Sequence, residues 1–260
     1  MSKKQSKATQ QANMAAASER AAAIRAEQER KERRSRALMI TGAVVGVLVL
    51  VVAIVVAVQA SRDTSGQAST PPANVVDEYT LAMGDDDAPV EVTVFEDMMC
   101  PYCGLFESVS SDKFKEYADS GDVQVRYHVV SFLDRASSTK YSTRAANAIA
   151  VVLDTAGPEV AVEFHDMLFA NQPEEGGEGL SDEQMIDMAV EAGADREAIE
   201  GPIADLKFEQ WVVNSTNAWS EAGHTGTPTV TVDGEKIEFT SAEDLLSNTE
   251  KAIEDALAGQ

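Results

Sequence analysis

Hydrophobic and polar side chains alternate over two stretches of the chain, residues 90–95 and 123–130. Both stretches are rich in valine, and alternation of this kind predicts β-strands. Between them, apolar residues recur at helical spacing from about 101 to 118. A strand, a helix and a second strand in this order predict a right-handed unit with two parallel strands. The helical repeat is carried by Leu105, Phe106, Val109 and Phe114.

The pattern then becomes helical from about residue 138 to 222, which predicts a long helical insertion. We expect this stretch to be broken where glycine and proline gather, because neither residue continues a helix well. These places are Gly157-Pro158, residues 172–179 and Gly201-Pro202.

A short β-segment follows the insertion. Residues 229–232 predict a strand, Asp233-Gly234 a tight turn, and residues 236–239 the antiparallel partner. Ser241 is suited to cap a last helix that runs to about residue 258, because its hydroxyl can accept a hydrogen bond from a free N–H of the first turn. The pattern as a whole therefore predicts an α/β domain.

The longest apolar run covers residues 38–58, with no charge and with Thr41 as its one polar side chain. A helix of that length spans roughly 30 Å, the thickness of a hydrocarbon core. We therefore predict one transmembrane helix over residues 37–58. A cleaved signal peptide is the alternative, since Val58-Gln59-Ala60 would serve as a cleavage site. Both the leader and the apolar run, however, are longer than in signal peptides.

Charge divides at this run. Residues 1–36 hold ten Lys or Arg and four Glu, a net charge of +6, so the remainder of this chain of charge −23 carries −29. Arg33, Arg34 and Arg36 directly precede the run, and the positive-inside rule places residues 1–36 in the cytoplasm and the later residues outside. The acidic outer part argues against nucleic acid as a partner, because phosphate binding needs a basic face. Its acidity is most simply that of a solvated surface.

Four segments result from these patterns. Residues 1–36 form a basic segment with Glu and Arg at helical spacing, and residues 37–58 anchor the chain in the membrane. Residues 59–74 are rich in Ser, Thr, Pro and Gly, as in a flexible linker. Residues 75–260 form one extracytoplasmic domain that is long enough to bury a core.

The two cysteines of the chain, Cys100 and Cys103, follow the first predicted strand and open the first predicted helix. Outside the membrane a cysteine pair usually forms a structural disulfide, but a bridge over so short a loop removes little entropy from the unfolded chain. Half of a zinc site is a second possibility, yet His128, His165 and His224 show no paired spacing. We therefore expect no metal and no cofactor. A C-x-x-C at a strand–helix junction favours a redox-active pair.

Pro101 suits the first helical position, where its missing N–H costs nothing. Cys100 would then lie at the helix N-terminus, whose free N–H groups and dipole stabilise a thiolate. We expect Cys100 to be the exposed sulfur that exchanges, and Cys103, one turn further on, to be its shielded partner. Nearby acids oppose a stabilised thiolate, and these are Glu96, Asp97 and Glu107.

The segments DMMCPYCGLFE at 97–107 and GTPTVTVDG at 226–234 resemble the DsbA-like branch of the thioredoxin superfamily. The resemblance covers residues from about 80 to 258, and a helical insertion between the two motifs is typical of that branch. It implies a thioredoxin fold and a cis Thr227-Pro228 bond that faces the cysteines, where the backbone pairs with a substrate peptide. Without the resemblance, a trans proline at the start of a strand is the simpler interpretation.

The resemblance also implies an activity. The chain would be a membrane-tethered, extracytoplasmic thiol–disulfide oxidoreductase that introduces or exchanges disulfides in reduced, unfolded exported proteins. A quinone-linked membrane oxidase would reoxidise its Cys100–Cys103 pair. A disulfide reductase or isomerase is the first alternative, and a non-catalytic peptide-binding chaperone is the second.

Several positions near the pair are candidates for supporting roles. Tyr102 stands where the strongest oxidants of the branch carry histidine, and it brings no positive charge, so we expect milder oxidising power. Many relatives carry a buried acid at the position of Val94. Asp97 and Glu107 match acids of the branch, but a solvated loop charge and a helix-surface charge describe them equally well.

Other residues near the motifs suit plainer roles. His224 is most simply a loop histidine, although it could tune Cys100. Met98 and Met99 could form an adaptable apolar rim for substrates, with packing as the default role. Four residues at helical spacing late in the insertion predict core positions. They are Phe208, Trp211, Val212 and Trp219.

Overall fold

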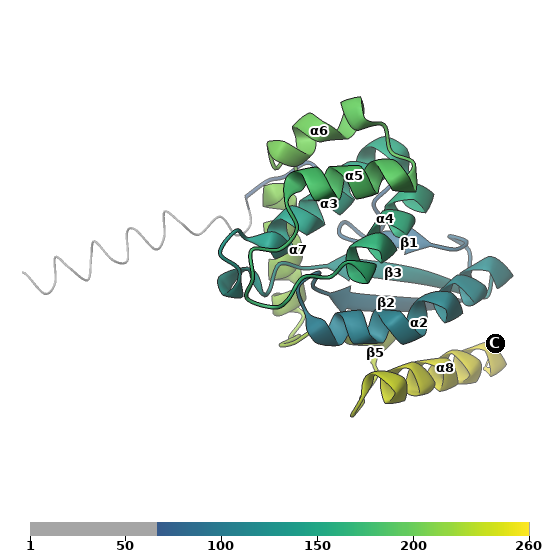
Figure 1. Ribbon diagram of the computed structural model, residues 1–260. Helices are drawn as coiled ribbons and strands as arrows, with labels where there is room; N and C mark the ends of the chain where they lie inside the picture. Colours follow the sequence, from purple (N-terminus) through teal and green to yellow (C-terminus); the bar gives the residue numbers. More distant parts are fainter. Residues whose placement is uncertain (1–66, 260) are drawn as a thin grey trace, which may run out of the picture. The chain divides into compact units, whose positions relative to one another are not determined.

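The structure, a computed structural model, describes residues 67–259 (Figure 1). The predicted cytoplasmic segment 1–36 and the predicted transmembrane helix 37–58 lie outside the described residues. Within residues 67–259, no helix is both long enough and apolar enough to cross a bilayer. Residues 67–259 contain the predicted α/β domain except for Gln260.

A five-stranded sheet in the order β1-β3-β2-β4-β5 forms the centre of this domain (Figure 1). Strands β2 and β3 are parallel, as the strand–helix–strand pattern predicts, and the other neighbouring pairs are antiparallel. Val92 lies opposite Val125 of β3 and Val232 of β4, which makes β2 the central strand. The strands are β1 Leu81–Met83, β2 Val90–Glu96, β3 Val123–Val129, β4 Thr229–Val232 and β5 Glu235–Lys236.

Strand β1 is not predicted by the sequence pattern, because three residues are too few to show an alternation. Its place at the sheet edge comes from antiparallel pairing, with Leu81 opposite Tyr127 and Met83 opposite Val125. Leu81 is buried there and extends the core beneath β3.

The helices cover both faces of the sheet. Helix α2 packs on β3 and against α8, while α7 packs against the same strand β3. Figure 1 shows α3, α5 and α6 gathered beyond the β1 edge of the sheet and α8 near β5, at the other edge. The helices are α2 Pro101–Ser120, α3 Tyr141–Ala156, α4 Pro158–Ala170, α5 Asp182–Ala192, α6 Arg196–Ala204, α7 Glu209–Glu221 and α8 Ala242–Ala258, with a 3-10 turn at Asp134–Ala136.

Helices α3 to α7 form the predicted insertion, and two of its three predicted breaks are confirmed. The chain breaks at Gly157 and between α4 and α5, but the break predicted at Gly201-Pro202 is wrong. Pro202 lies inside the nine-residue helix α6, near its C-terminal end, where its missing N–H costs one hydrogen bond. Asn147 of α3 stabilises the turn between α6 and α7. Its side chain donates a hydrogen bond to Ile203 O and accepts one from the Phe208 N–H.

The predicted core positions on α7 and just before it are confirmed. All four side chains are buried, and three of them are aromatic, so this stretch carries much of the apolar area between the insertion and the sheet. They are Phe208, Trp211, Val212 and Trp219.

The hairpin after the insertion has the predicted turn but a shorter second strand. Asp233 and Gly234 both have positive φ, at 49° and 82°, as a two-residue type I′ turn requires. Strand β5 is Glu235–Lys236 and not the predicted 236–239, and the last hydrogen bond to β4 runs from the Ile237 N–H to Val230 O, at 2.9 Å. Ser241 caps α8 as predicted, by accepting a hydrogen bond from the Asp244 N–H.

Residues 67–74, which the sequence pattern assigns to the linker, lie against the helical insertion. The Ala73 N–H donates to Asp154 Oδ1 at 2.8 Å, on α3. On α7, Asn214 Nδ2 donates to Gln67 O at 2.8 Å. This stretch of chain is therefore attached to the domain on the side of α3 and α7.

Candidate active site

Cys100 and Cys103 lie where the central strand β2 passes into α2. Cys100 is the N-cap residue of α2, with extended backbone (φ −76°, ψ 115°), and Pro101 follows in the first turn, as predicted. The N–H groups of Cys103 and Gly104 both donate to Cys100 O, at 3.0 and 3.1 Å, which closes the first turn. Both cysteines are free thiols.

The surroundings of Cys100 favour its thiolate. A hydrogen bond from the Cys103 thiol is the largest cause that lowers the pKa of Cys100 to about 6. Burial opposes this shift, and the N–H groups of Tyr102 and Cys103 support it. The pKa falls in the direction predicted from the helix N-terminus.

The exposure of Cys100 differs from the prediction. We expected an exposed sulfur, but the residue is only 5% exposed. The Cys100 Sγ lies 3.3 Å from Thr227 O, so the loop before β4 covers it. The sequence does not show that cover, because Thr227 is 127 residues away along the chain.

Cys103 is the more deeply buried of the two, at 1% exposure. Burial raises the pKa of Cys103 well above the usual thiol value, and its contacts with Cys100 and the charge of Glu96 raise it further. The two sulfurs, one helical turn apart, therefore differ strongly in acidity.

The Thr227-Pro228 bond is cis, as the resemblance implies. It precedes β4, which pairs antiparallel with β2 so that Thr229 lies opposite Phe95. This pairing brings the loop beside the start of α2. The Thr227 hydroxyl is buried and has no hydrogen-bond partner among the described residues.

Asp97 is fully buried, so the interpretation of this residue as a solvated loop charge is wrong. Its Oδ1 accepts from the Met99 N–H at 2.9 Å and the Ser142 hydroxyl at 2.6 Å. Its Oδ2 accepts from the Leu133 N–H at 2.8 Å. Burial raises the pKa of Asp97 to about 7, although these three hydrogen bonds oppose the shift.

Glu107 is also buried, at 5% exposure, and the interpretation as a helix-surface charge is wrong. Burial raises the pKa of Glu107 to about 7, and the nearby His165 opposes the shift. Glu107 lies one turn past Cys103 on the inward face of α2, which packs against α4.

The sequence analysis missed the pair of Glu96 and His165. Both residues are buried, and His165 Nε2 lies 2.5 Å from Glu96 Oε1. Burial alone would lower the pKa of His165, but Glu96 and Asp166 together raise it well above the usual value. A signal for Glu96 was present, because it continues the inward alternation of Val92 and Val94 along β2.

The apolar residues around the pair are arranged differently from the prediction. Met98 and Met99 are buried at about 1% and 0% exposure, so they pack in the core and form no rim. Instead, Tyr102 and Leu105 are exposed, at 70% and 57%. Leu105 was predicted to lie on the buried face of α2, but it lies beside the cysteines on the open face.

Gln172 is a further residue of the site that the sequence analysis missed. Its side-chain Nε2 donates to Met98 O at 3.1 Å and to Cys100 O at 2.9 Å. Gly104 leaves the room for it, because a Cβ at this position would overlap the Gln172 carboxamide. Gln172 follows α4, so the insertion holds the backbone of the cysteine turn directly.

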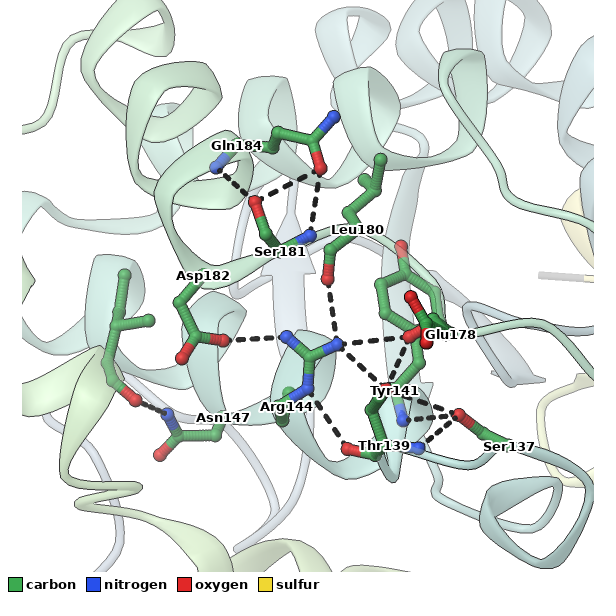
Figure 2. Close-up of polar contacts among 11 residues, drawn as sticks. Ser137, Thr139, Tyr141, Arg144, Asn147, Glu178, Leu180, Ser181, Asp182 and Gln184 are labelled. Carbon is green, nitrogen blue, oxygen red and sulfur yellow. Dashed lines mark hydrogen bonds and ion pairs between the residues drawn. The ribbon is translucent and has the colours of Figure 1, made fainter.

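Arg144 of α3 holds the loop that begins with Gln172. Its guanidinium donates to Asp182 Oδ1 and Leu180 O, both at 2.7 Å, and its Nε donates to Thr139 O at 3.1 Å. Figure 2 shows this guanidinium between Thr139, which precedes α3, and the end of the loop, where its partners are Glu178, Leu180 and Asp182. The loop is thus fixed at its far end by an arginine and at its near end by the cysteine turn.

The other two histidines are not part of this site. Burial lowers the pKa of His128 to about 4, and its Nε2 lies 3.1 Å from Ser215 O. The His224 ring packs on Phe95, with centroids 4.5 Å apart, and burial lowers its pKa as well. No hydrogen bond joins His224 to Cys100 in the described part of the chain.

A cysteine pair at the start of a helix, beside a cis proline, defines the class of thioredoxin-fold proteins with a C-x-x-C site. A family model described as Thioredoxin matches residues 76–254, and the chain belongs to this family. A second family model, described as an inhibitor of host cell division protein domain, matches residues 15–69, almost entirely outside the described residues.

Solved structures place the chain in the DsbA-like branch. The reduced form of DsbG from Mycobacterium tuberculosis is 27% identical, with a TM-score of 0.58, over 69% of this chain and 92% of that one. Oxidised BdbD from Bacillus subtilis is 25% identical, with a TM-score of 0.62, over 74% of this chain and 100% of that one. The expected fold, a thioredoxin fold with a helical insertion, is confirmed.

Curated relatives are of two kinds. Serine/threonine-protein kinase PknE of Mycobacterium tuberculosis is 35% identical over 122 residues, which cover 45% of this chain and 21% of PknE. This chain therefore spans about a fifth of that kinase. Disulfide bond formation protein D of Bacillus subtilis is 27% identical over 174 residues, 66% of this chain and 76% of that protein.

Proposed function

We propose that this chain is a DsbA-type thiol–disulfide oxidoreductase, with Cys100 as the exchanging sulfur and Cys103 as its partner. The observation that carries the proposal is the contrast between the two thiols. The pKa of Cys100 is lowered to about 6, whereas that of Cys103 is raised well above its usual value. At neutral pH the first sulfur is therefore a good nucleophile and leaving group, while the second stays protonated.

In the oxidative direction, a substrate thiolate attacks the Cys100 Sγ of the Cys100–Cys103 disulfide. The S–S bond breaks, its electron pair goes to Cys103, and the high pKa of Cys103 makes it take up a proton. A second substrate thiolate then attacks the substrate sulfur of the mixed disulfide, and Cys100 leaves as a thiolate. The substrate loses two electrons and two protons. The cysteine pair gains the two electrons, one proton goes to Cys103, and the other goes to the solvent.

Neighbouring residues support this exchange in different ways. Pro101 starts α2 behind Cys100, and the Thr227-Pro228 loop offers backbone beside the sulfur for a substrate peptide. Asp97, with a pKa of about 7, can gain or lose a proton at neutral pH. The exposed Tyr102 would contact the substrate. The buried Glu107, one helical turn past Cys103, would influence the pair by its charge.

We propose further that the domain works outside the cytoplasm, held to the membrane by a helix over residues 37–58. The apolar run and the arginines before it support this placement. Its substrates would be reduced exported proteins, and a quinone-linked membrane oxidase would regenerate the disulfide. The printed name of the Bacillus subtilis relative, a disulfide bond formation protein, agrees with this role.

The reduction potential of the pair tests the direction of exchange. The purified full chain is equilibrated with glutathione buffers, and the reduced fraction is counted after alkylation. A stabilised Cys100 thiolate predicts an oxidising value, between about −120 mV for DsbA and about −180 mV for protein disulfide isomerase. A value near that of thioredoxin, about −270 mV, would contradict the oxidative role and favour a reductase.

A further inference from the structure

Three polar side chains converge between α2 and α4, beyond the cysteine turn along α2. They are Glu107, His165 and Asp166, and one ligand atom of each lies within 4.8 Å of the other two. Glu107 and His165 are buried, and Asp166 is half-buried. A buried imidazole nitrogen with carboxylate oxygens is a donor set that suits Zn²⁺.

The Glu107 carboxylate has no partner of its own. Both of its oxygens are buried, and neither accepts a hydrogen bond within the described residues. The nearby Ser111 hydroxyl is directed instead to Asp166 Oδ2, at 3.4 Å. A buried carboxylate without a hydrogen-bond donor is costly, and the nearby His165 offsets this cost by its charge but donates no hydrogen bond to it, so both carboxylate oxygens remain available to a ligand.

His165 is oriented as a metal-binding histidine is. Its Nε2 lies 2.5 Å from Glu96 Oε1, and its Nδ1 faces Asp166 Oδ1 at 3.1 Å. A histidine that binds a metal usually donates its other ring N–H to a carboxylate, which fixes the tautomer and the ring. Glu96 plays this part here, and it leaves Nδ1 on the side of Asp166.

A cavity borders Glu107 and Asp166, two of the three residues of this cluster. It measures about 340 Å³ and opens between α2 and α4, with Glu107, Ser111, Asp112 and Asp166 in its wall. Outside the lining of this cavity, Lys115 Nζ lies 2.6 Å from Asp166 Oδ2, and its side chain is 40% exposed. The cavity has room for water to complete the coordination, and the exposed lysine can swing out as an ion enters.

We propose that Glu107, His165 Nδ1 and Asp166 bind one divalent transition-metal ion, with Zn²⁺ as the best fit. The coordination would be completed by water from the cavity, and Glu96 would hold the histidine. Lys115 competes with the ion for Asp166. Neither thiol is a ligand of this site, and the proposal does not depend on the proposed thiol–disulfide exchange.

Zn²⁺ binding to the full chain tests the site. Cys100 and Cys103 are both replaced by serine for this purpose, so that no thiolate can bind the metal. Calorimetric titration with Zn²⁺ should give one ion per chain, and Glu107→Gln should weaken binding at least tenfold. Glu116→Gln removes an exposed acid from the same helix and should leave the affinity unchanged. Lys115→Gln should tighten binding severalfold, because it removes the competing charge.

Two further measurements distinguish loss of the site from failure of a variant to fold. Zn²⁺ should raise the Tm of the parent chain and of Lys115→Gln, but not that of Glu107→Gln. In ¹⁵N-histidine spectra the Nδ1 resonance of His165 should move on addition of Zn²⁺. Equal Zn²⁺ affinity in the parent and Glu107→Gln, no binding at all, or tighter binding of Ca²⁺ than of Zn²⁺ would overturn the site. The last result would show that carboxylates alone hold the ion.

Discussion

The acids on the two sides of the cysteine pair are held in different ways, although they are neighbours in the chain. Asp97, whose charge acts on Cys100, accepts hydrogen bonds from two N–H groups and the Ser142 hydroxyl. Glu96, whose charge acts on Cys103, is paired instead with the imidazole of His165. Neutral donors hold the acid on the Cys100 side, and an ionisable partner holds the acid on the Cys103 side.

This difference fits the different tasks of the two sulfurs. Neutral hydrogen bonds offset only part of the cost of burial, so the pKa of Asp97 reaches about 7 and its charge can change near neutral pH. On the Cys103 side, Glu96 and Asp166 together raise the pKa of His165 well above its usual value, against the effect of burial. The acid on the exchanging side can therefore gain or lose a proton near neutral pH, while the acid on the Cys103 side has a histidine as its partner.

The largest expected effect comes from exchanging each sulfur for oxygen. Cys100→Ser should abolish exchange with a dithiol peptide, because the sulfur that attacks and leaves is gone. Cys103→Ser cannot form the disulfide that a substrate thiolate attacks, so it should not oxidise the dithiol peptide either. Its Cys100 thiolate can still attack the disulfide of an oxidised peptide, and the resulting mixed disulfide should accumulate because the chain has no second sulfur to resolve it. Turnover and trapped complexes are followed by gel shift and mass spectrometry.

Full function in Cys100→Ser would show that the groove works as a binding module without exchange. Equal trapping by the two variants would remove the division of roles between the sulfurs.

The next effect concerns the ion pair on the Cys103 side. His165→Gln leaves the Glu96 carboxylate buried without its charged partner, and the free energy of unfolding should fall by about 3–5 kcal/mol. Urea unfolding measures this loss. His224→Gln, in the partly exposed loop before β4, should cost about 0.5 kcal/mol or less. A similar cost for both histidines would mean that the Glu96 pair is not a distinct support.

On the Cys100 side, the matching change is Ser142→Ala. It removes a hydrogen bond to a buried carboxylate, so stability should fall by about 1–3 kcal/mol, less than for the ion pair. The pKa of Asp97 should also rise further above its usual value, because Ser142 is one of the groups that lower it. Ser108→Ala, an exposed hydroxyl on α2, is the control. A larger loss for Ser142→Ala than for His165→Gln would reverse the comparison.

The smallest expected effect concerns Gln172, whose side chain contacts the backbone of the cysteine turn. Gln172→Ala removes two hydrogen bonds to the cysteine turn and should cost about 1 kcal/mol. Gly104→Ala should also destabilise the chain, because the new Cβ displaces the same carboxamide.

In the Gln172→Ala background, the Gly104 substitution should become neutral or stabilising, since alanine favours a helix over glycine by about 1 kcal/mol. Urea unfolding of the four chains completes this double-mutant cycle. Additive costs would show that the two residues do not share the contact.

Local pattern predicted most of the sheet and the position of the cysteines. The alternation in β2 and β3, the turn at Asp233-Gly234 and the cap at Ser241 all depend on near neighbours, and all are confirmed. The cis bond before Pro228 followed from the resemblance and not from the pattern.

The surroundings of the thiols could not be predicted, because they come from distant parts of the chain. His165 is 69 residues from Glu96, and Gln172 is 72 residues from Cys100. Both belong to the insertion. Its helical pattern predicts which face of each helix is buried, but not which part of the sheet that face contacts. For the same reason Asp97 and Glu107 appeared equally suited to solvent, although both are buried.

The central claim is that the two sulfurs of one helical turn differ in acidity, and separate pH titrations test it directly. The full chain is reduced and alkylated briefly between pH 4 and 10, and mass spectrometry measures the rate at each cysteine. A lowered pKa means that the thiolate is present above the midpoint and lost below it, so the Cys100 rate should fall with a midpoint of about pH 6. Cys103 should stay unreactive past its usual range, about pH 8.5. A Cys100 midpoint at or above that value, or equal midpoints for both sulfurs, would contradict the account.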